Sequence, residues 1–178
     1  SNSEIYLLNS AYFLIPPKGL KAKFLLAILN SSIIYFYLLN NAETSGMGTS
    51  RWINNHVKEF PIKISTDAIQ NQLSILTDYL IYLASLRNDS IYFSFFDSLI
   101  DSIIYELYFP EEIKSAGKEI LKHLGDLKPI TDEMSEEEKL AVIQSEYERL
   151  SHAEHPVKRP MDTLEEVEEV RIIREALK

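Results

Sequence analysis

The chain of 178 residues is 46% apolar and 25% charged, the balance of a soluble globular protein, with a formal net charge of −9. Only 5 glycines occur, which disfavours a fold with many tight turns, and the absence of cysteine excludes disulfides, thiolate metal sites and a cysteine nucleophile. A chain without cysteine suits the reducing cytosol, so we expect a cytoplasmic protein.

Short apolar segments near the N-terminus predict a small β element. Residues 4–8 and 12–15 are rich in Ile, Tyr and Phe and are bounded by turn-forming residues. The β-branched alternation of residues 61–64 favours a further strand. We therefore expect a mainly helical α+β fold, with the β element confined to residues 1–64. The chain also begins abruptly, after a Ser-Asn pair typical of a tag remnant, so we expect a piece of a longer protein.

A strong central helix is predicted over Leu20–Leu39, because apolar residues recur at helical spacing on nearly every side. Its most apolar part, Phe24–Leu39, is 16 residues long, shorter than the ~20 residues that cross a bilayer. Polar residues Asn30-Ser31-Ser32 interrupt its centre. We expect a buried core helix and no membrane partner.

Three helices are predicted next, beginning with an antiparallel pair that forms a helical hairpin. The first starts near Thr66 and has five apolar residues at heptad spacing: Ile69, Leu73, Leu76, Leu80 and Leu83. Its partner is predicted to be capped by Ser94. The third helix is expected to start at Pro110 and to be closed by Gly125.

The C-terminal part is acidic. Ser135-Glu136-Glu137-Glu138 has the pattern of a capping box that opens a helix, and Thr163 is expected to open another. Residues 1–64 hold six Lys/Arg and three Asp/Glu, a net charge of +3. Residues 65–178 hold 12 Lys/Arg and 24 Asp/Glu, a net charge of −12. Phosphate groups would be attracted to the first part and repelled by the second.

Three regions follow from these patterns. Residues 1–64 form a positively charged first region, residues 65–124 a helical spacer or bundle, and residues 125–178 an acidic helical extension. This division is a prediction from composition and periodicity alone.

No catalytic motif is present. The sequence lacks glycine-rich nucleotide loops, nucleophile and zinc-protease motifs, and the Asn/Asp-Pro-Pro-Tyr/Phe turn with which adenine methyltransferases hold a flipped base. Glu112-Ile113-Lys114 has a nuclease-like spacing but fits a solvated helix face better. His152 and His155 have no apparent third ligand, so we expect an exposed pair and no metal site.

The order of residues 24–62 resembles a known family. A helix with Leu-Leu-Ala-Ile-Leu-Asn-Ser-Ser leads to a polar loop containing glycines, then to Arg51-Trp52, and finally to Phe-Pro-Ile at residues 60–62. This order resembles the TaqI-like C-terminal specificity domain of restriction–modification methyltransferases. Gln70–Leu86 is similar to the helical spacer of that family, and residues 96–108 are similar to its closing helix.

The resemblance extends into the C-terminal part of the chain, but the sequence differs from the family pattern in two respects. Residues 127–132 and 171–178 look like the tails of type IIG enzymes, which join methylase and nuclease in one chain. The upstream half of the specificity region is absent, however, so the resemblance implies that residues 1–64 are the C-terminal part of a truncated DNA target-recognition subdomain. In addition, Phe109-Pro110 replaces the family's usual Leu/Tyr-Gly step, so the turn that follows is expected to differ.

The resemblance implies a division of labour in a longer bacterial protein. The upstream domains would form an adenine-specific DNA methyltransferase that uses S-adenosylmethionine, with Mg²⁺ if the parent is also an endonuclease. This chain would need no cofactor and would have no catalytic residue. Its partners would be double-stranded DNA and those upstream domains, and it would supply part of the recognition of the target sequence.

The residues expected at the DNA share positive or hydrogen-bonding side chains and lie within the first 58 positions: Lys18, Lys21, Lys23, Ser45, Thr49, Ser50, Arg51, Asn54, Asn55, His56 and Lys58. Lys18, Lys21 and Lys23 cluster at the predicted start of a helix, where free backbone N–H groups and the helix dipole favour contact with a phosphate. The asparagines and the histidine are candidates for reading base edges, and Arg51 is a candidate for guanine.

Structural alternatives stand beside these roles. Arg51 is equally suited to an ion pair with Glu43 or Glu59, Trp52 fits a core anchor better than a base-stacking residue, and the asparagines are common in turns. At the level of the whole chain, the alternative is a helical scaffold that docks on the catalytic domains without direct base readout. The acidic C-terminal part favours that role for residues 65–178.

Overall fold

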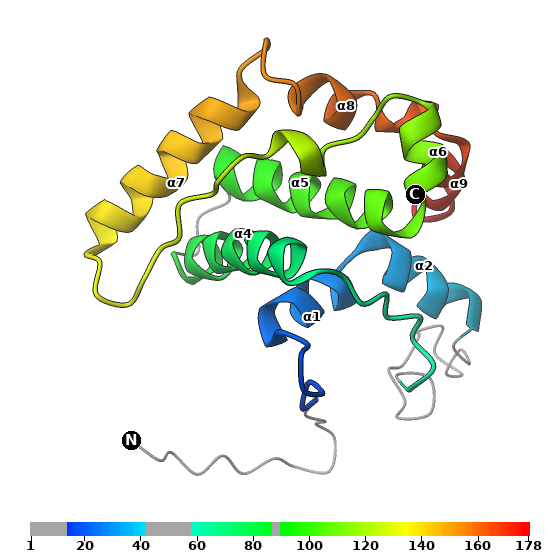
Figure 1. The fold of residues 1–178 in the computed structure, drawn as a ribbon, viewed down its shortest axis with the longest axis horizontal. Helices are drawn as coiled ribbons and strands as arrows, with labels where there is room; N and C mark the ends of the chain where they lie inside the picture. The colour runs from blue at the N-terminus through cyan, green and yellow to red at the C-terminus, as the bar shows by residue number, and fades with distance from the viewer. Residues whose placement is uncertain (1–13, 42–57, 87–89) are drawn as a thin grey trace.

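The structure of the protein, a computed structural model, describes residues 14–41, 58–86 and 90–178 (Figure 1). Helices form its regular structure: α1 (Ala22–Leu29), α2 (Ser32–Asn41), α4 (Asp67–Ser85), α5 (Ile91–Tyr108), α6 (Pro110–Ser115), α7 (Glu136–Ser151), α8 (Lys158–Asp162) and α9 (Glu168–Ala176). Two 3₁₀ turns, η1 (Leu121–His123) and η2 (Leu164–Glu166), lie between them.

The predicted β element is wrong for the residues that the structure describes, because residues 14–41, 58–86 and 90–178 contain no strand. The segment around residues 61–64 has no partner strand. Instead, the Tyr108 hydroxyl of α5 donates to the Pro61 carbonyl at 2.6 Å and accepts from the Lys63 N–H at 3.3 Å. One helix side chain therefore satisfies backbone groups that a neighbouring strand would otherwise bind. Residues 4–8 lie outside the described part.

The single helix predicted over Leu20–Leu39 is two helices, α1 and α2, whose axes differ by 58°. At the bend, Ser31 Oγ donates to the Ile28 carbonyl at 2.7 Å and accepts from the Ile34 N–H at 3.4 Å. Asp101 of α5 accepts from the Ser32 N–H at 2.9 Å. These acceptors satisfy N–H groups at the start of α2 that a continuous helix would satisfy with its own carbonyls.

One face of α1 and α2 is buried inside the protein, with Phe24, Ile28 and Ile34 fully inaccessible to solvent, whereas Leu26, Tyr35 and Leu39 are exposed. Among the described helices, none alone is long and apolar enough to cross a membrane. α1 and α2 together reach that length and composition, across the bend between them.

The predicted helical hairpin is confirmed by α4 and α5, which lie side by side (Figure 1). α4 begins next to Thr66 as expected, and the Thr66 hydroxyl caps it by accepting from the Ile69 N–H at 3.4 Å. The Tyr79 and Phe96 rings meet edge to face at 5.1 Å, near the middle of the seam. The cap of α5 is Ser90, not Ser94, because Ser94 already lies within the first turn of the helix.

The C-terminal part has shorter helices than predicted. The third helix, expected from Pro110 to Gly125, ends at Ser115 because Gly117 adopts a left-handed conformation with φ of 67°. The Ser135 capping box is confirmed, with the Glu138 N–H donating to Ser135 Oγ at 3.2 Å and the Ser135 N–H donating to Glu138 Oε2 at 2.7 Å. The last α-helix begins at Glu168, after η2, and Thr163 does not cap it.

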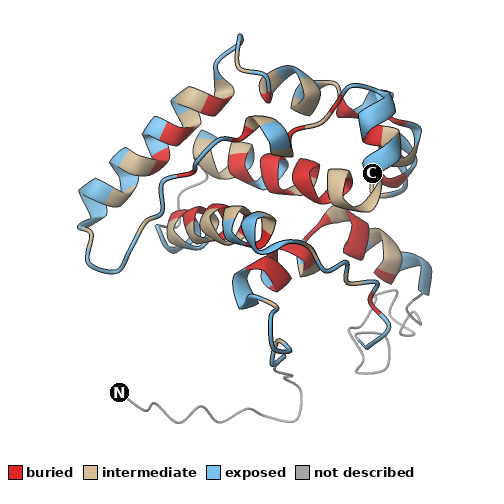
Figure 2. Ribbon diagram, viewed as in Figure 1, coloured by how far each residue is buried: buried red, intermediate tan, exposed pale blue. Residues whose placement is uncertain are grey.

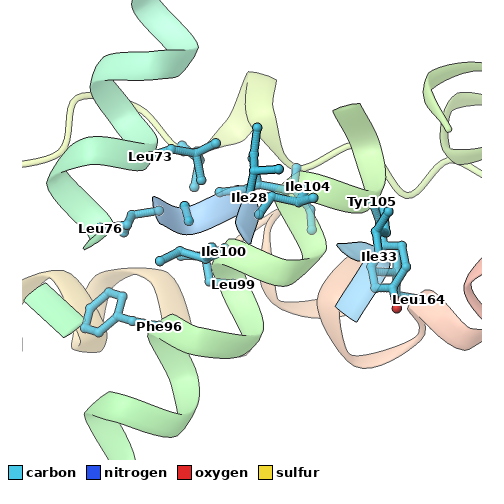
Figure 3. Packing of buried hydrophobic residues seen from close by; sticks show 14 of the residues in the cluster. Ile28, Ile33, Leu73, Leu76, Phe96, Leu99, Ile100, Ile104, Tyr105 and Leu164 are labelled. Carbon is cyan, nitrogen blue, oxygen red and sulfur yellow. The ribbon is translucent and has the colours of Figure 1, made fainter. Parts of the chain in front are cut away.

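One hydrophobic cluster joins all three regions that the sequence suggested (Figure 2). It includes Phe24 of α1, Leu76 of α4, Ile104 of α5, Ile143 of α7 and Leu164 of η2, each fully buried. Figure 3 shows Ile28, Leu73 and Leu76 facing Leu99 and Ile100 across the α1, α4 and α5 interface. The division at residues 64 and 124 stays a prediction, but residues on both sides of each limit share this core.

Two buried tyrosines differ in what their hydroxyls bind, and this difference gives a stability prediction. The Tyr79 hydroxyl donates to the Lys128 carbonyl, whereas the Tyr105 hydroxyl is buried with no hydrogen-bond partner among the described residues. We expect Tyr79→Phe to lower the free energy of unfolding by about 1 kcal/mol and Tyr105→Phe to leave it unchanged or raise it. Urea unfolding followed by circular dichroism measures both. Equal losses for the two variants would contradict this arrangement.

Candidate nucleic-acid interface

The turn before α1 presents a lysine at its apex. The Leu20 N–H donates to the Pro17 carbonyl at 3.0 Å, and Gly19 has φ of 89°. This is a type II turn, whose third position requires a positive φ and therefore favours glycine. Lys18 occupies the second position and is exposed.

Gln70 of α4 ties this turn to the segment that precedes α4. Its side chain is 2% exposed, and all of its contacts go to backbone atoms. Gln70 Oε1 accepts from the Lys21 N–H at 2.9 Å, while Nε2 donates to the Gly19 carbonyl at 3.2 Å and to the Ser65 carbonyl at 3.0 Å. Both amide protons are used, so one side chain fixes residues 19–21 and residue 65 against the start of α4.

The described lysines of the first 64 residues form what we call the basic surface: Lys18, Lys21, Lys23, Lys58 and Lys63. The segments that carry them run below α4 and α5 in the view of Figure 1. These five include four of the residues predicted to contact DNA.

Two of these lysines have partners on α4. The Lys21 ammonium donates to the Asn71 side-chain oxygen, and the Lys23 ammonium forms an ion pair with Asp78. The Lys23 side chain is still 50% exposed, so it can reach solvent or a phosphate on its outer side. A phosphate that binds Lys23 must nevertheless compete with a neighbouring carboxylate.

The other three lysines are available. Within the described residues, the ammonium groups of Lys18, Lys58 and Lys63 make no hydrogen bond and no ion pair. All three side chains are on exposed residues, where an ammonium group can displace counterions from a phosphate backbone. Lys63 was not among the residues predicted from the sequence. Its charge was the signal that could have identified it, because it belongs to the same positive region.

Seven of the predicted contact residues lie outside the described part of the chain: Ser45, Thr49, Ser50, Arg51, Asn54, Asn55 and His56. Their roles, and the alternatives for Arg51 and Trp52, stay predictions. The structure describes the chain on either side of them, with α2 ending at Asn41 and Lys58 resuming the chain.

Many acidic side chains of the C-terminal part are paired within it. Arg149 holds the buried carboxylate of Glu146 at 2.5 Å, Lys158 pairs with Asp162 at 2.5 Å, and Arg171 pairs with Glu168 at 2.6 Å. These pairs leave the net charge of residues 65–178 at −12, because acids outnumber bases there two to one. A phosphate backbone would therefore be repelled by the C-terminal part.

His152 and His155, which were considered as metal ligands, accept hydrogen bonds from backbone N–H groups two residues further along the chain. His152 Nδ1 accepts from the Glu154 N–H and His155 Nδ1 accepts from the Val157 N–H, each at 3.3 Å. Burial lowers the pKa of His155, and the charges of Arg149, His123 and His152 lower it further. Among the described residues, no group of three or more His, Asp or Glu side chains is placed to hold a metal ion.

A family comparison covers the segment that carries the basic surface. Residues 1–62 match the TaqI-like C-terminal specificity domain. The resemblance drawn from residues 24–62 is thereby confirmed, and the match includes all eleven residues predicted to contact DNA. No curated protein and no solved structure matches the chain.

We call residues 1–62 the TaqI-like segment, because they are similar to a specificity domain of the kind that recognises DNA sequences in restriction–modification enzymes. It contains α1 and α2 and ends within the segment held by Tyr108. The similarity of residues 70–86 and 96–108 to further helices of that family stays a prediction, because these residues lie beyond the match.

The role of Gln70 can be tested by its removal. Gln70→Leu leaves the Lys21 N–H and two carbonyls without their partner, and we expect the free energy of unfolding to fall by about 1–3 kcal/mol. Gln72→Leu is the matched control, because Gln72 lies on the same helix and makes one exposed bond, to the Gly125 carbonyl. Chemical denaturation compares the two. If Gln70→Leu lowers the free energy of unfolding no more than Gln72→Leu does, the hydrogen bonds of Gln70 contribute little to stability.

Proposed function

We propose that this chain is the sequence-recognition portion of a type IIG restriction–modification enzyme, or of a related adenine-specific DNA methyltransferase. In this proposal the chain is not catalytic, and the chemistry belongs to other domains of the parent protein in the bacterial cytoplasm. The observation that carries the proposal is that the segment matching the specificity domain also holds exposed lysines with no partner among the described residues.

Phosphate contact and base readout are assigned to different parts of residues 1–64. Lys18, Lys58 and Lys63 would neutralise backbone phosphates and set the position of the protein on the duplex. Base edges would be read by residues between positions 45 and 56, with Arg51 placed on a guanine. Gln70 would act indirectly, by holding the Lys18 turn beside the segment that carries Lys63.

The catalytic assignment rests on the motifs that the sequence lacks. Without the Asn/Asp-Pro-Pro-Tyr/Phe turn, residues of this chain cannot hold a flipped adenine in the way that methyltransferases do. S-adenosylmethionine would bind the upstream domains, as would the Mg²⁺ of a nuclease. The chain itself would need neither.

A scaffold role is the second candidate, and it concerns residues 65–178. The supporting observation is that α5, α7 and η2 complete the same core that buries α1 and α2. A region with a net charge of −12 is poorly suited to contact DNA but well suited to support the segment that does. The two candidates therefore apply to different parts of one chain.

Salt dependence tests the phosphate contacts. We expect Lys18→Ala and Lys63→Ala in the parent enzyme each to flatten the plot of log affinity against log salt concentration by about 0.9 per lost phosphate contact. Lys23→Ala should change the slope less, because Asp78 already pairs with Lys23. Fluorescence anisotropy with a labelled duplex measures the slope. Lys114→Ala, on an exposed residue of α6, is the control, and an equal change there would argue against a defined basic surface.

Arg51 separates base readout from a structural role. If Arg51 binds a guanine, Arg51→Ala should reduce discrimination between the target and a singly substituted duplex by about 1–3 kcal/mol. If Arg51 instead pairs with Glu43 or Glu59, the variant should melt at a lower temperature and keep its sequence preference. Both quantities are measured on one variant. A destabilised but equally selective enzyme would assign Arg51 to the scaffold.

A further inference from the structure

The C-terminal helix α9, far outside the family match, packs against α2 inside it. We propose that Asp101 of α5 and Arg174 of α9 are positioning residues for DNA recognition. Through Ser32 and Tyr105, they set the direction in which α2 leaves the core. The inference rests on the proposed recognition of DNA by the TaqI-like segment.

Asp101 holds the first residue of α2 with both carboxylate oxygens. Oδ1 accepts from the Ser32 N–H at 2.9 Å, and Oδ2 accepts from the Ser32 hydroxyl at 2.7 Å. A carboxylate at this place also faces the positive end of the α2 dipole. Burial raises the pKa of Asp101, while the two bonds from Ser32 and the charge of Arg174 lower it. The start of α2 is therefore held by a side chain from a different helix.

Arg174 of α9 contacts the same helix, α5, that carries Asp101. Its guanidinium lies 5.7 Å from the centre of the Tyr105 ring, one turn beyond Asp101 on α5, and it pairs with Glu165 at 3.4 Å. Figure 3 shows Tyr105 gathered with Ile33 of α2 and Leu164 of η2. On the same helix as Arg174, Val170 and Ile173 are buried. α9 is thus fixed by apolar packing, and its arginine lies against the helix that holds α2.

The outer face of α2 is open to solvent. On its inner face, Ile33, Ile34 and Leu38 are buried, and the Tyr37 ring meets Phe60 edge to face at 5.9 Å. On its outer face, Tyr35 is 50% exposed and Leu39 is 40% exposed. The bend at Ser31 breaks its continuity with α1. A helix of 10 residues is about 15 Å long, so a tilt of about 10° at its start moves its far end by roughly 2–3 Å. Recognition sites tolerate displacements of about 0.5 Å.

The start of α2 borders a pocket. A cavity of about 640 Å³ is lined by residues of α1, α4 and α5 together with Ser32, Asp101 and Arg174. Asp97, Glu165 and Lys178 complete its charged wall. Because space adjoins the bonds of Asp101, packing alone does not hold α2 in place on that side.

The experiment uses the parent enzyme and measures two quantities for each variant. One is the ratio of affinities for the target duplex and for a singly substituted duplex, and the other is the melting temperature. Asp101→Ala and Arg174→Met should each lower the affinity ratio about tenfold while the slope of affinity against salt stays unchanged. Asp101→Asn should restore most of the ratio, because an amide oxygen can still accept from the Ser32 N–H.

Arg171→Met is the matched control. Arg171 lies on the same helix, and its ion pairs are made with Glu168 and Glu175 of that helix. It should change neither quantity appreciably. If Asp101→Ala fails to fold, Ser32→Ala, which removes the hydroxyl bond and keeps the N–H bond, should give a smaller loss of the ratio.

The outcomes separate the two proposals. An unmodified enzyme that does not discriminate between the duplexes overturns the proposed function, and the inference falls with it. A selective enzyme whose selectivity survives Asp101→Ala, or Ser32→Ala if the former does not fold, together with Arg174→Met, overturns only the inference. A lower melting temperature with an unchanged affinity ratio also overturns it, because that result is expected of a purely structural contact.

Discussion

The packing of α4 against α5 is the interaction on which the rest of the structure depends. α1 lies on α4, while α2, α6, α7 and α8 each pack on α5. The seam between α4 and α5 is fully buried, with Leu76, Tyr79 and Phe96 at its centre. α9, which follows the pair, also packs directly on α2, which precedes it. The TaqI-like segment and the acidic extension are consequently two sides of one packed body.

The sequence predicted those features of the fold that depend on neighbouring residues. Ser135 was identified as a cap because a cap binds an N–H only a few positions away, and the start of α4 near Thr66 was identified from the spacing of apolar residues. The break between α1 and α2 was missed because the residue that stabilises it, Asp101, is 69 positions from Ser32. The predicted strand at residues 61–64 failed for a similar reason, since the Tyr108 hydroxyl binds its backbone from a distant helix. Propensity contains no information about such partners.

The candidate interface was predicted only in part, and charge was the useful signal. The excess of lysine in the first 64 residues located the positive region, but not which lysines are available. Asn71 and Asp78 bind Lys21 and Lys23, and periodicity cannot reveal those contacts. Gln70 was missed because a glutamine within a helix is usually a solvated residue. The role of Gln70 depends on residues 19–21 and residue 65, which the fold brings beside it.

The shared core has a consequence for exchanging specificity between enzymes. Phe24 and Ile34 of the TaqI-like segment pack in the same cluster as Leu164 and Ile173 near the C-terminus. A chimera joined at residue 62, where the family match ends, would pair each half of the core with a surface that it does not fit. The smallest transferable unit is thus set by packing and reaches from α1 to α9. New target preferences are better sought by substituting single residues on an intact body than by transplanting residues 1–62 alone.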